Sequence, residues 1–335
     1  FSLFVILLSG FIIAVLIKNI RLHINHMFSI RQPKKIIFGK NSCQNYDFPK
    51  NSLLITSGGA KSRGWLDYLK IEKFELFDKV EPNPSMETVN RILSESDQNF
   101  SSVIGLGGGS SLDVAKFVGN KLKKTKILIP TTFGSGSEVT RISVLKVDGK
   151  KTSFHSDDLL ADIAIIDPYF IKDAPMEIIK NSAIDACAQC TEAYDSKLAN
   201  NYTRLLCEKA FDILEKAIIN EKYEDLAYGA MICGLGFGNA STTLGHALSY
   251  VFSNEGISHG HALAFTTTIA HKFNDSQFYE RFKFLVEKLK FKPIKLNQDL
   301  NDASTLIQKD RKHLDNNPKN VSNEDIIKLL LLINS

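Results

Sequence analysis

One segment of the sequence places three polar side chains on a single face of an otherwise small and apolar helix. Asp185, Gln189 and Glu192 follow one another at i, i+4 and i+7 among alanine and cysteine residues, and this spacing aligns them in one stripe of an α-helix. A buried carboxylate is costly unless it has a partner. We therefore expect Asp185 to face a cation, a metal ion or a ligand, with pairing inside a core as the alternative. Downstream, His246 and His259 can supply nitrogen ligands to the same centre.

A glycine-rich turn is the second group of residues that suggests chemistry. It lies between a predicted strand at 103–106 and a predicted helix at 112–122, and it reads Gly107-Gly108-Gly109-Ser110-Ser111. Glycine lets the backbone approach an anion, and the N–H groups and dipole at the helix start can hold a pyrophosphate. A tight strand-to-helix turn without a ligand would also use glycine. A second predicted strand runs into Thr131-Thr132-Phe133-Gly134-Ser135-Gly136-Ser137-Glu138, and two such loops at adjacent strand ends suit a dinucleotide.

The elements that position these groups change character along the chain. Four β-rich runs alternate with helical stretches between Ile36 and Asp167, at 53–56, 103–106, 127–130 and 163–166, which predicts parallel α/β architecture. A Ser85 N-cap opens a crossover helix at 86–94. After Pro175 the patterns are helical without a clear strand. We predict an α/β dinucleotide-binding domain at 27–172, an all-helical metal and substrate domain at 173–335, and a site in the cleft between them.

Composition narrows the function classes. A chain of 335 residues is long enough for two domains, and its net charge of +4 is scattered, so we expect no nucleic-acid partner. Five cysteines form no regular disulfide framework, which fits a cytoplasmic protein. Cys187 and Cys190 have C-x-x-C spacing but lie on a different helix face from Asp185, and no second cysteine pair completes a zinc site.

The N-terminus is the unusual part of the chain. An uncharged run from Phe1 to Ile17 is followed by Lys18 and Arg21. We interpret residues 1–26 as a hydrophobic leader in front of the true start, with Met27 opening a first strand. The alternative is a native membrane anchor that tethers a cytosolic catalytic part.

Five motifs together give the chain a resemblance to a known family. They are Gly107 to Lys116, Pro130 to Glu138, Ile184-Asp185-Ala186, His246-Ala247-Leu248-Ser249-Tyr250 and His259-Gly260-His261. In this order they resemble the iron-containing (group III) alcohol dehydrogenases, which have the dehydroquinate-synthase-like fold. The resemblance covers nearly everything after Met27. It implies a divalent metal ion, Fe²⁺ or Zn²⁺, between a cofactor domain and a helical domain, and a homodimer.

The resemblance also implies a set of metal ligands. The family pattern of one Asp and three His maps to Asp185, Gln189, His246 and His259, so one imidazole is replaced by an amide whose carbonyl oxygen is a poorer ligand for iron or zinc. His261 is the residue that a rearranged site would use instead, and its other expected role is a contact with a metal ligand or with the substrate. Many members carry a further His near the substrate, at the position of Tyr250 here. A tyrosine can donate a hydrogen bond or relay a proton there, or simply pack.

The cofactor residues follow from the same resemblance. Gly107, Gly108, Gly109 and Ser110 would hold the pyrophosphate, Thr131, Thr132 and Ser135 would line the nucleotide, Lys151 would supply a basic group near the cofactor, and Asp113 would lie near the nicotinamide. After the first strand no carboxylate is available to bind a ribose hydroxyl, whereas Lys61 and Arg63 follow closely. This favours NADP over NAD.

The predicted activity is reversible hydride transfer between NAD or NADP and a small aldehyde or alcohol. The histidine motifs look like those of members that act on small anionic aldehydes such as phosphonoacetaldehyde. Two alternatives stay open. One is a lyase or cyclase of the same fold that acts on a sugar phosphate, although the motifs lack the basic cluster that it needs. The other is a non-catalytic nucleotide-binding protein whose metal site has decayed through Gln189.

Overall fold

A computed structural model describes residues 27–97 and 99–334. The chain separates into a unit up to Ile30 and a unit from Arg31 onward, and the second unit holds everything described below. The predicted leader or membrane anchor at 1–26 lies outside the described residues. Among the residues that are described, no helix combines the length and apolar character that a membrane crossing requires.

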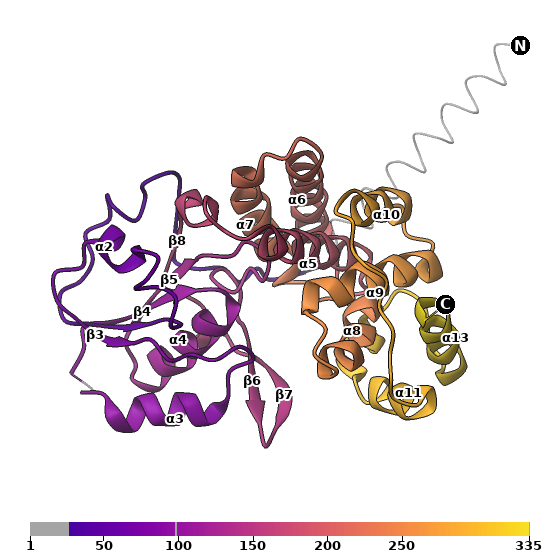
Figure 1. The fold of residues 1–335 in the computed structure, drawn as a ribbon, viewed down its shortest axis with the longest axis horizontal. Coiled ribbons are helices and arrows are strands. Elements are labelled where there is room, and N and C mark those ends of the chain that lie inside the picture. Colours follow the sequence, from indigo (N-terminus) through magenta and orange to yellow (C-terminus); the bar gives the residue numbers. More distant parts are fainter. Residues whose placement is uncertain (1–26, 98, 335) are drawn as a thin grey trace, which may run out of the picture. The chain divides into compact units, whose positions relative to one another are not determined.

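A six-stranded parallel sheet forms the first part of the second unit (Figure 1). Its strands are β1 (Lys35–Phe38), β2 (Ser52–Ile55), β3 (Phe74–Phe77), β4 (Ser102–Gly107), β5 (Thr125–Pro130) and β8 (Ile163–Ile166). They are arranged in the order β1-β8-β5-β4-β2-β3, and every pairing is parallel. All carboxyl ends therefore meet at one edge, which is where ligands bind in sheets of this type. The predicted parallel α/β architecture is confirmed.

Both faces of the sheet are covered, and this explains the continuous apolar strands. Alternate residues such as Leu53 and Val103 pack in one cluster with α3 (Met86–Glu95) and α4 (Gly109–Lys121). Their neighbours Leu54 and Ile104 pack on the other face with α2 (Trp65–Leu69) and the short helix η2 (Pro168–Ile171). Because side chains alternate along a strand, burial on both faces requires apolar residues at every position.

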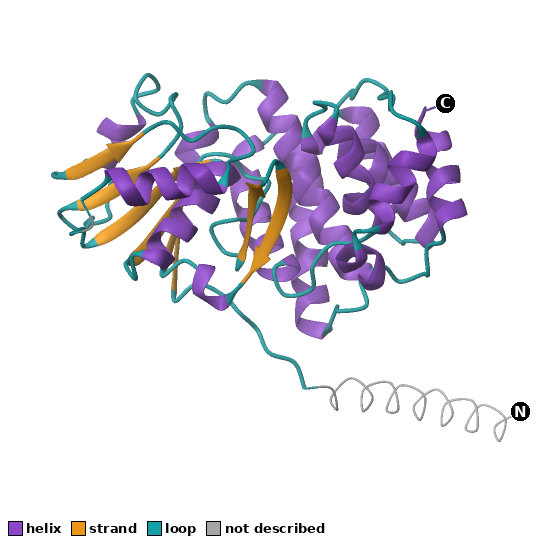
Figure 2. Ribbon diagram, turned by 90° about the horizontal axis from the view of Figure 1, so that it is seen from below, coloured by secondary structure: helices purple, strands orange, loops and turns teal. Residues whose placement is uncertain are grey.

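The chain beyond Asp167 forms helices only, within the described residues, as predicted. They are α5 (Met176–Asp195), α6 (Asn201–Ile219), α7 (Leu226–Phe237), α8 (Leu244–Asn254), α9 (His259–Asn274), α10 (Tyr279–Lys288), α11 (Leu300–Gln308), α12 (Arg311–Asn316) and α13 (Asn323–Asn334), with the short η3 (Tyr223–Asp225) before α7. Helix α5 is central, because α6, α7 and α9 all pack against it. Figure 2 shows the helices gathered at one end of the unit and the sheet at the other.

Of the local predictions, one agrees with the structure and two differ from it. The Ser85 cap is present and accepts a hydrogen bond from the Thr88 N–H. The prediction that a first strand opens at Met27 was wrong. The first strand starts at Lys35, after Pro33, because pairing with β8 begins there. An antiparallel hairpin of β6 (Ile142–Val147) and β7 (Lys150–His155), with the 3₁₀ helix η1 (Asp157–Leu159) after it, was not predicted. Its mixed polar and apolar residues are typical of a partly exposed ribbon.

Asp167 joins the end of β8 to the loop after β1. Its buried carboxylate accepts hydrogen bonds from the backbone N–H groups of Asn41 and Cys43 and from the Tyr68 hydroxyl, the last at 2.8 Å. It also caps η2 by accepting from the Tyr169 N–H. One side chain thus fixes the carboxyl edge of the sheet, beside which the glycine-rich turn lies.

We predict that Asp167→Ala lowers the free energy of unfolding by about 2–4 kcal/mol, because several buried donors lose their acceptor together. Urea unfolding followed by circular dichroism measures the effect. The control is Asp315→Ala, which removes an exposed carboxylate paired with Arg311 and should cost less than about 1 kcal/mol. Equal losses for the two variants would contradict the assignment of Asp167 as a structural anchor.

Candidate functional site

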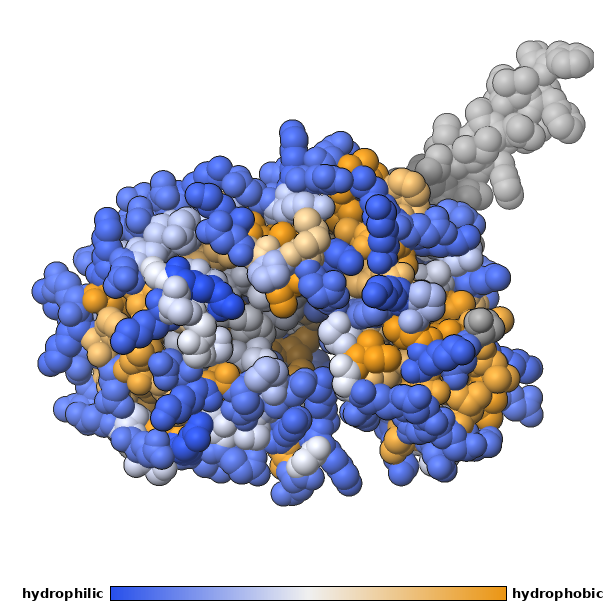
Figure 3. Space-filling model, in the orientation of Figure 1, coloured by the Kyte–Doolittle hydropathy of each residue, from blue (hydrophilic) through white to orange (hydrophobic). Residues whose placement is uncertain are grey.

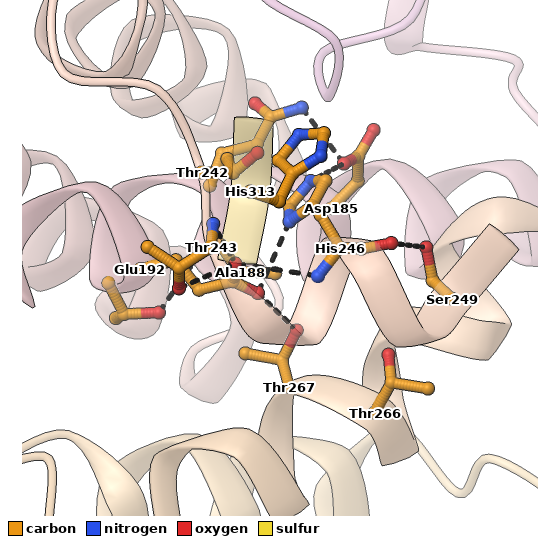
Figure 4. A network of polar contacts seen from close by, with 12 residues as sticks. Asp185, Ala188, Glu192, Thr242, Thr243, His246, Ser249, Thr266, Thr267 and His313 are labelled. Atoms are coloured by element: carbon orange, nitrogen blue, oxygen red, sulfur yellow. Dashed lines mark hydrogen bonds and ion pairs between the residues drawn. The ribbon is translucent and has the colours of Figure 1, made fainter. Parts of the chain in front are cut away.

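Three helices bring Asp185, His246 and His259 together. Asp185 extends from α5, His246 from α8 and His259 from α9. The Nε2 atoms of both histidines lie 3.9 Å from Oδ1 of Asp185, and one ligand atom from each residue falls within 4.8 Å of the other two. Figure 4 shows Asp185 and His246 pointing toward one another across the helix contact. The three residues singled out from the sequence therefore converge on one point.

Glycines beside each histidine permit this convergence. A Cβ on Gly245 would lie 2.2 Å from Oε1 of Glu192, and a Cβ on Gly260 would lie 2.2 Å from the backbone oxygen of Asn181. Any larger residue would push α8 or α9 away from α5. The sequence pairs Gly245-His246 and His259-Gly260 thus combine a ligand with the close approach that positions it.

Glu192 holds His246 in the orientation that the site requires. Its carboxylate lies 3.2 Å from Nδ1 of His246 and also accepts hydrogen bonds from Thr243 and Thr267 (Figure 4). Because a carboxylate only accepts, Nδ1 carries a proton, and Nε2, which faces Asp185, is the nitrogen that can lose its proton and bind a metal ion. Burial opposes the ionisation of Glu192, but His246 and these hydrogen bonds lower its pKa to about 2. The sequence stripe contained Glu192, yet its role depends on a contact that the sequence does not show.

The electrostatics of the cluster favour a bound cation. Burial raises the pKa of Asp185 to about 6, although the positive charges of His246 and Lys151 act in the opposite direction. Burial, together with the charges of His246 and Lys151, holds the pKa of His259 well below its usual range. A neutral imidazole and a carboxylate that lacks a full counter-charge are both suited to a divalent metal ion.

Gln189 lies beside the three ligands but presents a hydrogen-bond donor to them. Its Nε2 donates to Oδ1 of Asp185 at 2.9 Å, and its Oε1 faces Sγ of Cys233 at 3.8 Å. In this orientation the amide oxygen points away from the carboxylate. The side-chain amide of Gln189 has to rotate before its oxygen can face the metal ligands, so ligation by Gln189 stays a prediction.

The two residues predicted to act on the substrate are placed differently. The ring of Tyr250 stacks on His259 with centroids 6.3 Å apart, and burial raises its pKa above the usual range, so it remains a protonated donor. His261 is directed elsewhere. Its Nε2 lies 2.6 Å from the backbone oxygen of Lys292, and its ring contacts Phe265 and Phe291. Replacement of a metal ligand by His261 finds no support in this arrangement.

A pocket at the carboxyl edge of the sheet contains part of the predicted cofactor site. It has a volume of 340 Å³, and its lining includes Gly108, Thr131 and Thr132 together with Arg63 and Tyr169. The loops after β4 and β5 are neighbours, since the Thr131 N–H donates to the backbone oxygen of Gly107. On the face shown in Figure 3, the surface is hollowed between the sheet and the helices.

The remaining predicted cofactor residues are not among those that line this pocket. Gly107, Gly109, Ser110 and Ser135 lie in or beside the same two loops, and Gly109 begins α4. The carboxylate of Asp113 is buried and accepts from the Ser137 hydroxyl and the Val144 N–H. It therefore braces the loop after β5 against α4. Lys151 lies on β7 and interacts with Asp185, so it is near the metal ligands.

Comparison with known families decides the relationship. The family model for iron-containing alcohol dehydrogenases matches residues 33–168, and the model for the C-terminal part of the same family matches residues 179–315. The chain belongs to the iron-containing alcohol dehydrogenase family. The two matches span both the sheet and the helices that carry the cluster.

Curated relatives agree with this membership. A 4-hydroxybutyrate dehydrogenase from Clostridium kluyveri is 36% identical over 209 residues, which cover 53% of this chain and 56% of the relative. A 1-propanol dehydrogenase from Salmonella typhimurium is 30% identical, with 70% of this chain and 69% of the relative covered. The chain spans little more than half the length of the first of these relatives.

Solved structures share the fold. An iron-containing alcohol dehydrogenase from Thermococcus thioreducens superposes with a TM-score of 0.82 at 23% identity, covering 92% of this chain and 99% of that one. A sulfoacetaldehyde reductase from Bifidobacterium kashiwanohense, in complex with NAD⁺, has the same TM-score at 22% identity, covering 93% of this chain and 100% of that one.

The three clustered residues fit the metal that the family name indicates. Two of the separations among the three ligand atoms are 3.9 Å and the third is at most 4.8 Å. One centre can therefore lie about 2.2–2.5 Å from all three atoms, close to the usual distances of nitrogen and oxygen ligands. Two imidazoles and a carboxylate suit both iron and zinc. Glu192, bonded to the far side of His246, supplies the outer carboxylate typical of such sites.

We predict that Glu192→Gln weakens metal affinity by about 10–100-fold, because the amide no longer fixes the tautomer of His246 by charge. Equilibrium titration of chelator-treated protein with Zn²⁺, against a competing dye, measures this. Glu177→Gln on the same helix is the matched control, since Glu177 is exposed and pairs with Lys180. Equal affinities for both variants would contradict an orienting role of Glu192.

Proposed function

We propose that the protein is a metal-dependent, NAD(P)-linked alcohol dehydrogenase or aldehyde reductase. The observation that carries this proposal is the convergence of Asp185, His246 and His259 within one unit that also holds a nucleotide-sized pocket at the carboxyl edge of the sheet. Family membership supports the same reaction class.

Each residue of the cluster has a defined task in this reaction. Asp185, His246 and His259 would hold Fe²⁺ or Zn²⁺, with Gln189 as a further ligand. When bound, such an ion acts as a Lewis acid that polarises the oxygen of the alcohol or carbonyl substrate. Tyr250, protonated at neutral pH and stacked on His259, is positioned to donate a hydrogen bond to a substrate in the site.

The cofactor would occupy the pocket at the sheet edge. The predicted phosphate-binding residues are Gly107, Gly108, Gly109 and Ser110, with Thr131, Thr132 and Ser135 along the nucleotide. Arg63 lies over the ring of Trp65, 5.0 Å from its centroid, and both residues line the pocket. A guanidinium at this pocket can pair with the 2′-phosphate of NADP, and the only carboxylate among the residues that line the pocket is that of Asp173. The proposed preference is therefore NADP over NAD.

A small anionic aldehyde is the substrate class that we favour. The charge of Lys151, on β7 of the hairpin, lowers the pKa of the Asp185 carboxyl, which supports a cation within reach of a bound substrate. The names of two similar proteins refer to anionic compounds, namely 4-hydroxybutyrate and sulfoacetaldehyde. An anionic group on the substrate would pair with Lys151 and leave the carbonyl directed at the cluster.

The organisation of the chain is part of the proposal. We infer a cofactor domain ending near residue 172 and a metal and substrate domain at 173–335, in line with family matches that end at 168 and begin at 179. A homodimer and a cytoplasmic location complete the proposal. The small-molecule substrate class is consistent with the named relatives.

We predict NADPH oxidation by the metal-loaded protein with aldehydes, faster with sulfoacetaldehyde or succinate semialdehyde than with propanal. Asp185→Asn should lower kcat/KM by more than about 100-fold, because the polarising ion is lost. Asp302→Asn, an exposed position on α11, is the control.

Arg63→Ala should reduce the preference for NADPH over NADH by about 10-fold.

One outcome would contradict the proposed activity, and another would contradict only the proposed substrate class. Protein that binds NADPH but no metal and reduces none of the aldehydes would instead be the non-catalytic nucleotide-binding protein. Equal rates with charged and uncharged aldehydes would reject the anionic substrate class while leaving the dehydrogenase activity in place.

A further inference from the structure

A fourth imidazole lies beside the candidate metal centre, outside the cluster of Asp185, His246 and His259, and it comes from a part of the chain to which the sequence assigns no chemistry. His313, on the short helix α12, is buried at 5% exposure. Its ring lies nearly parallel to that of His246, with centroids 6.2 Å apart, and edge-on to that of Tyr250 at 5.8 Å. Figure 4 shows it beside His246 and Asp185.

The two nitrogens of His313 have different surroundings. Nδ1 lies 2.8 and 2.7 Å from the two carboxylate oxygens of Asp310. Burial acts against ionisation of Asp310, yet its contact with His313 holds the pKa of this carboxyl below the usual range, so Nδ1 donates. Among the residues that the structure describes, Nε2 of His313 has no hydrogen-bond partner. This is the arrangement of a carboxylate, a histidine and a free ring nitrogen that metal ligands adopt.

Helix α12 holds this histidine in place. Asp310 caps the helix by accepting from the His313 N–H. At the other end, the side-chain amide of Asn316 donates to the backbone oxygens of Ala240 and Thr242, just before α8. Because His246 lies on α8, the anchoring of α12 to this segment fixes the two imidazoles relative to each other.

The predicted ligand set leaves room for another imidazole. Gln189 donates its N–H toward Asp185 in this structure, so only three side chains offer a lone pair or charge to the centre. Two imidazoles on one ion have ring centroids about 5–6 Å apart when each nitrogen lies about 2.1 Å from it. The separation of 5.4 Å between His246 and His259 fits this range. The 6.2 Å between His246 and His313 exceeds it, and the ligand atoms of His313 are not within 4.8 Å of those of all three clustered residues, so the His313 ring has to move toward the centre to bind the ion.

We propose that His313, oriented by Asp310, is an additional ligand of the metal ion and takes the place left by an imidazole at position 189. The inference rests on the proposed function only in that both require a divalent metal at Asp185. It differs in the prediction that α12, rather than α5, completes the centre. A substrate contact by His313 without metal ligation is the competing role.

The test uses Co²⁺ as the probe, because its visible absorption reports the number and type of ligands. Chelator-treated full chain is titrated with Co²⁺, and affinity and spectrum are recorded. His313→Ala should weaken affinity by about 10–100-fold and change the visible bands, and Asp310→Asn should act in the same direction. Arg311→Ala, exposed on the same helix, and Asp315→Asn are the matched controls and should match wild type.

A rescue variant separates ligation from a general effect on folding. Gln189→His in the His313→Ala background should restore affinity, because it returns an imidazole to the centre from the other helix. Circular dichroism and thermal unfolding of the metal-free variants verify that they are folded. Should His313→Ala unfold, Asp310→Asn carries the same test, since it keeps the imidazole but removes the charge that orients it.

Each outcome bears on one of the two proposals. Wild-type affinity and an unchanged spectrum in both His313→Ala and Asp310→Asn would overturn ligation by His313, and a raised KM alone would assign the residue to the substrate. Metal binding through His313 without NADPH oxidation would support this inference and overturn the proposed function. A Co²⁺ spectrum of the Asp185→Asn variant identical to that of the wild-type protein would overturn both proposals.

Discussion

The structure depends on the burial of one carboxylate between two imidazoles where three helices meet. The pKa of Asp185 is raised by burial to about 6, which corresponds to about 3 kcal/mol against its charged form. The apparent binding free energy of a divalent ion at such a site is about 10 kcal/mol or more. The cost of placing Asp185 there is therefore small beside the interaction that it makes possible, and the packing around it follows from that requirement.

The surrounding residues show how the chain meets this requirement. Glycines at 245 and 260 let α8 and α9 approach α5 closely enough for their histidines to reach Asp185. Glu192 fixes the tautomer of His246 from the far side. The parallel sheet brings the loops after β4 and β5 together at one edge, so the nucleotide pocket and the metal ligands belong to one unit.

The strands of the sheet and the helix that carries Asp185 could be predicted from the sequence because they rest on local patterns. Short β-rich runs predicted the four central strands, and the stripe of Asp185, Gln189 and Glu192 placed the cluster on a helix. Tertiary contacts decide the rest. Nothing in the local sequence distinguishes Glu192 as an orienting group, predicts the β6–β7 hairpin, or brings His313 across from a short helix more than a hundred residues after Asp185. The amide orientation of Gln189 likewise depends on its neighbours Asp185 and Cys233.

Anomalous diffraction from crystals of the protein loaded with zinc tests the central claim most directly. A difference map at the zinc absorption edge should show one strong peak about 2.0–2.3 Å from Oδ1 of Asp185 and from Nε2 of His246 and His259. A zinc peak elsewhere in the molecule, or stoichiometrically loaded crystals with no peak among these three atoms, would contradict the account.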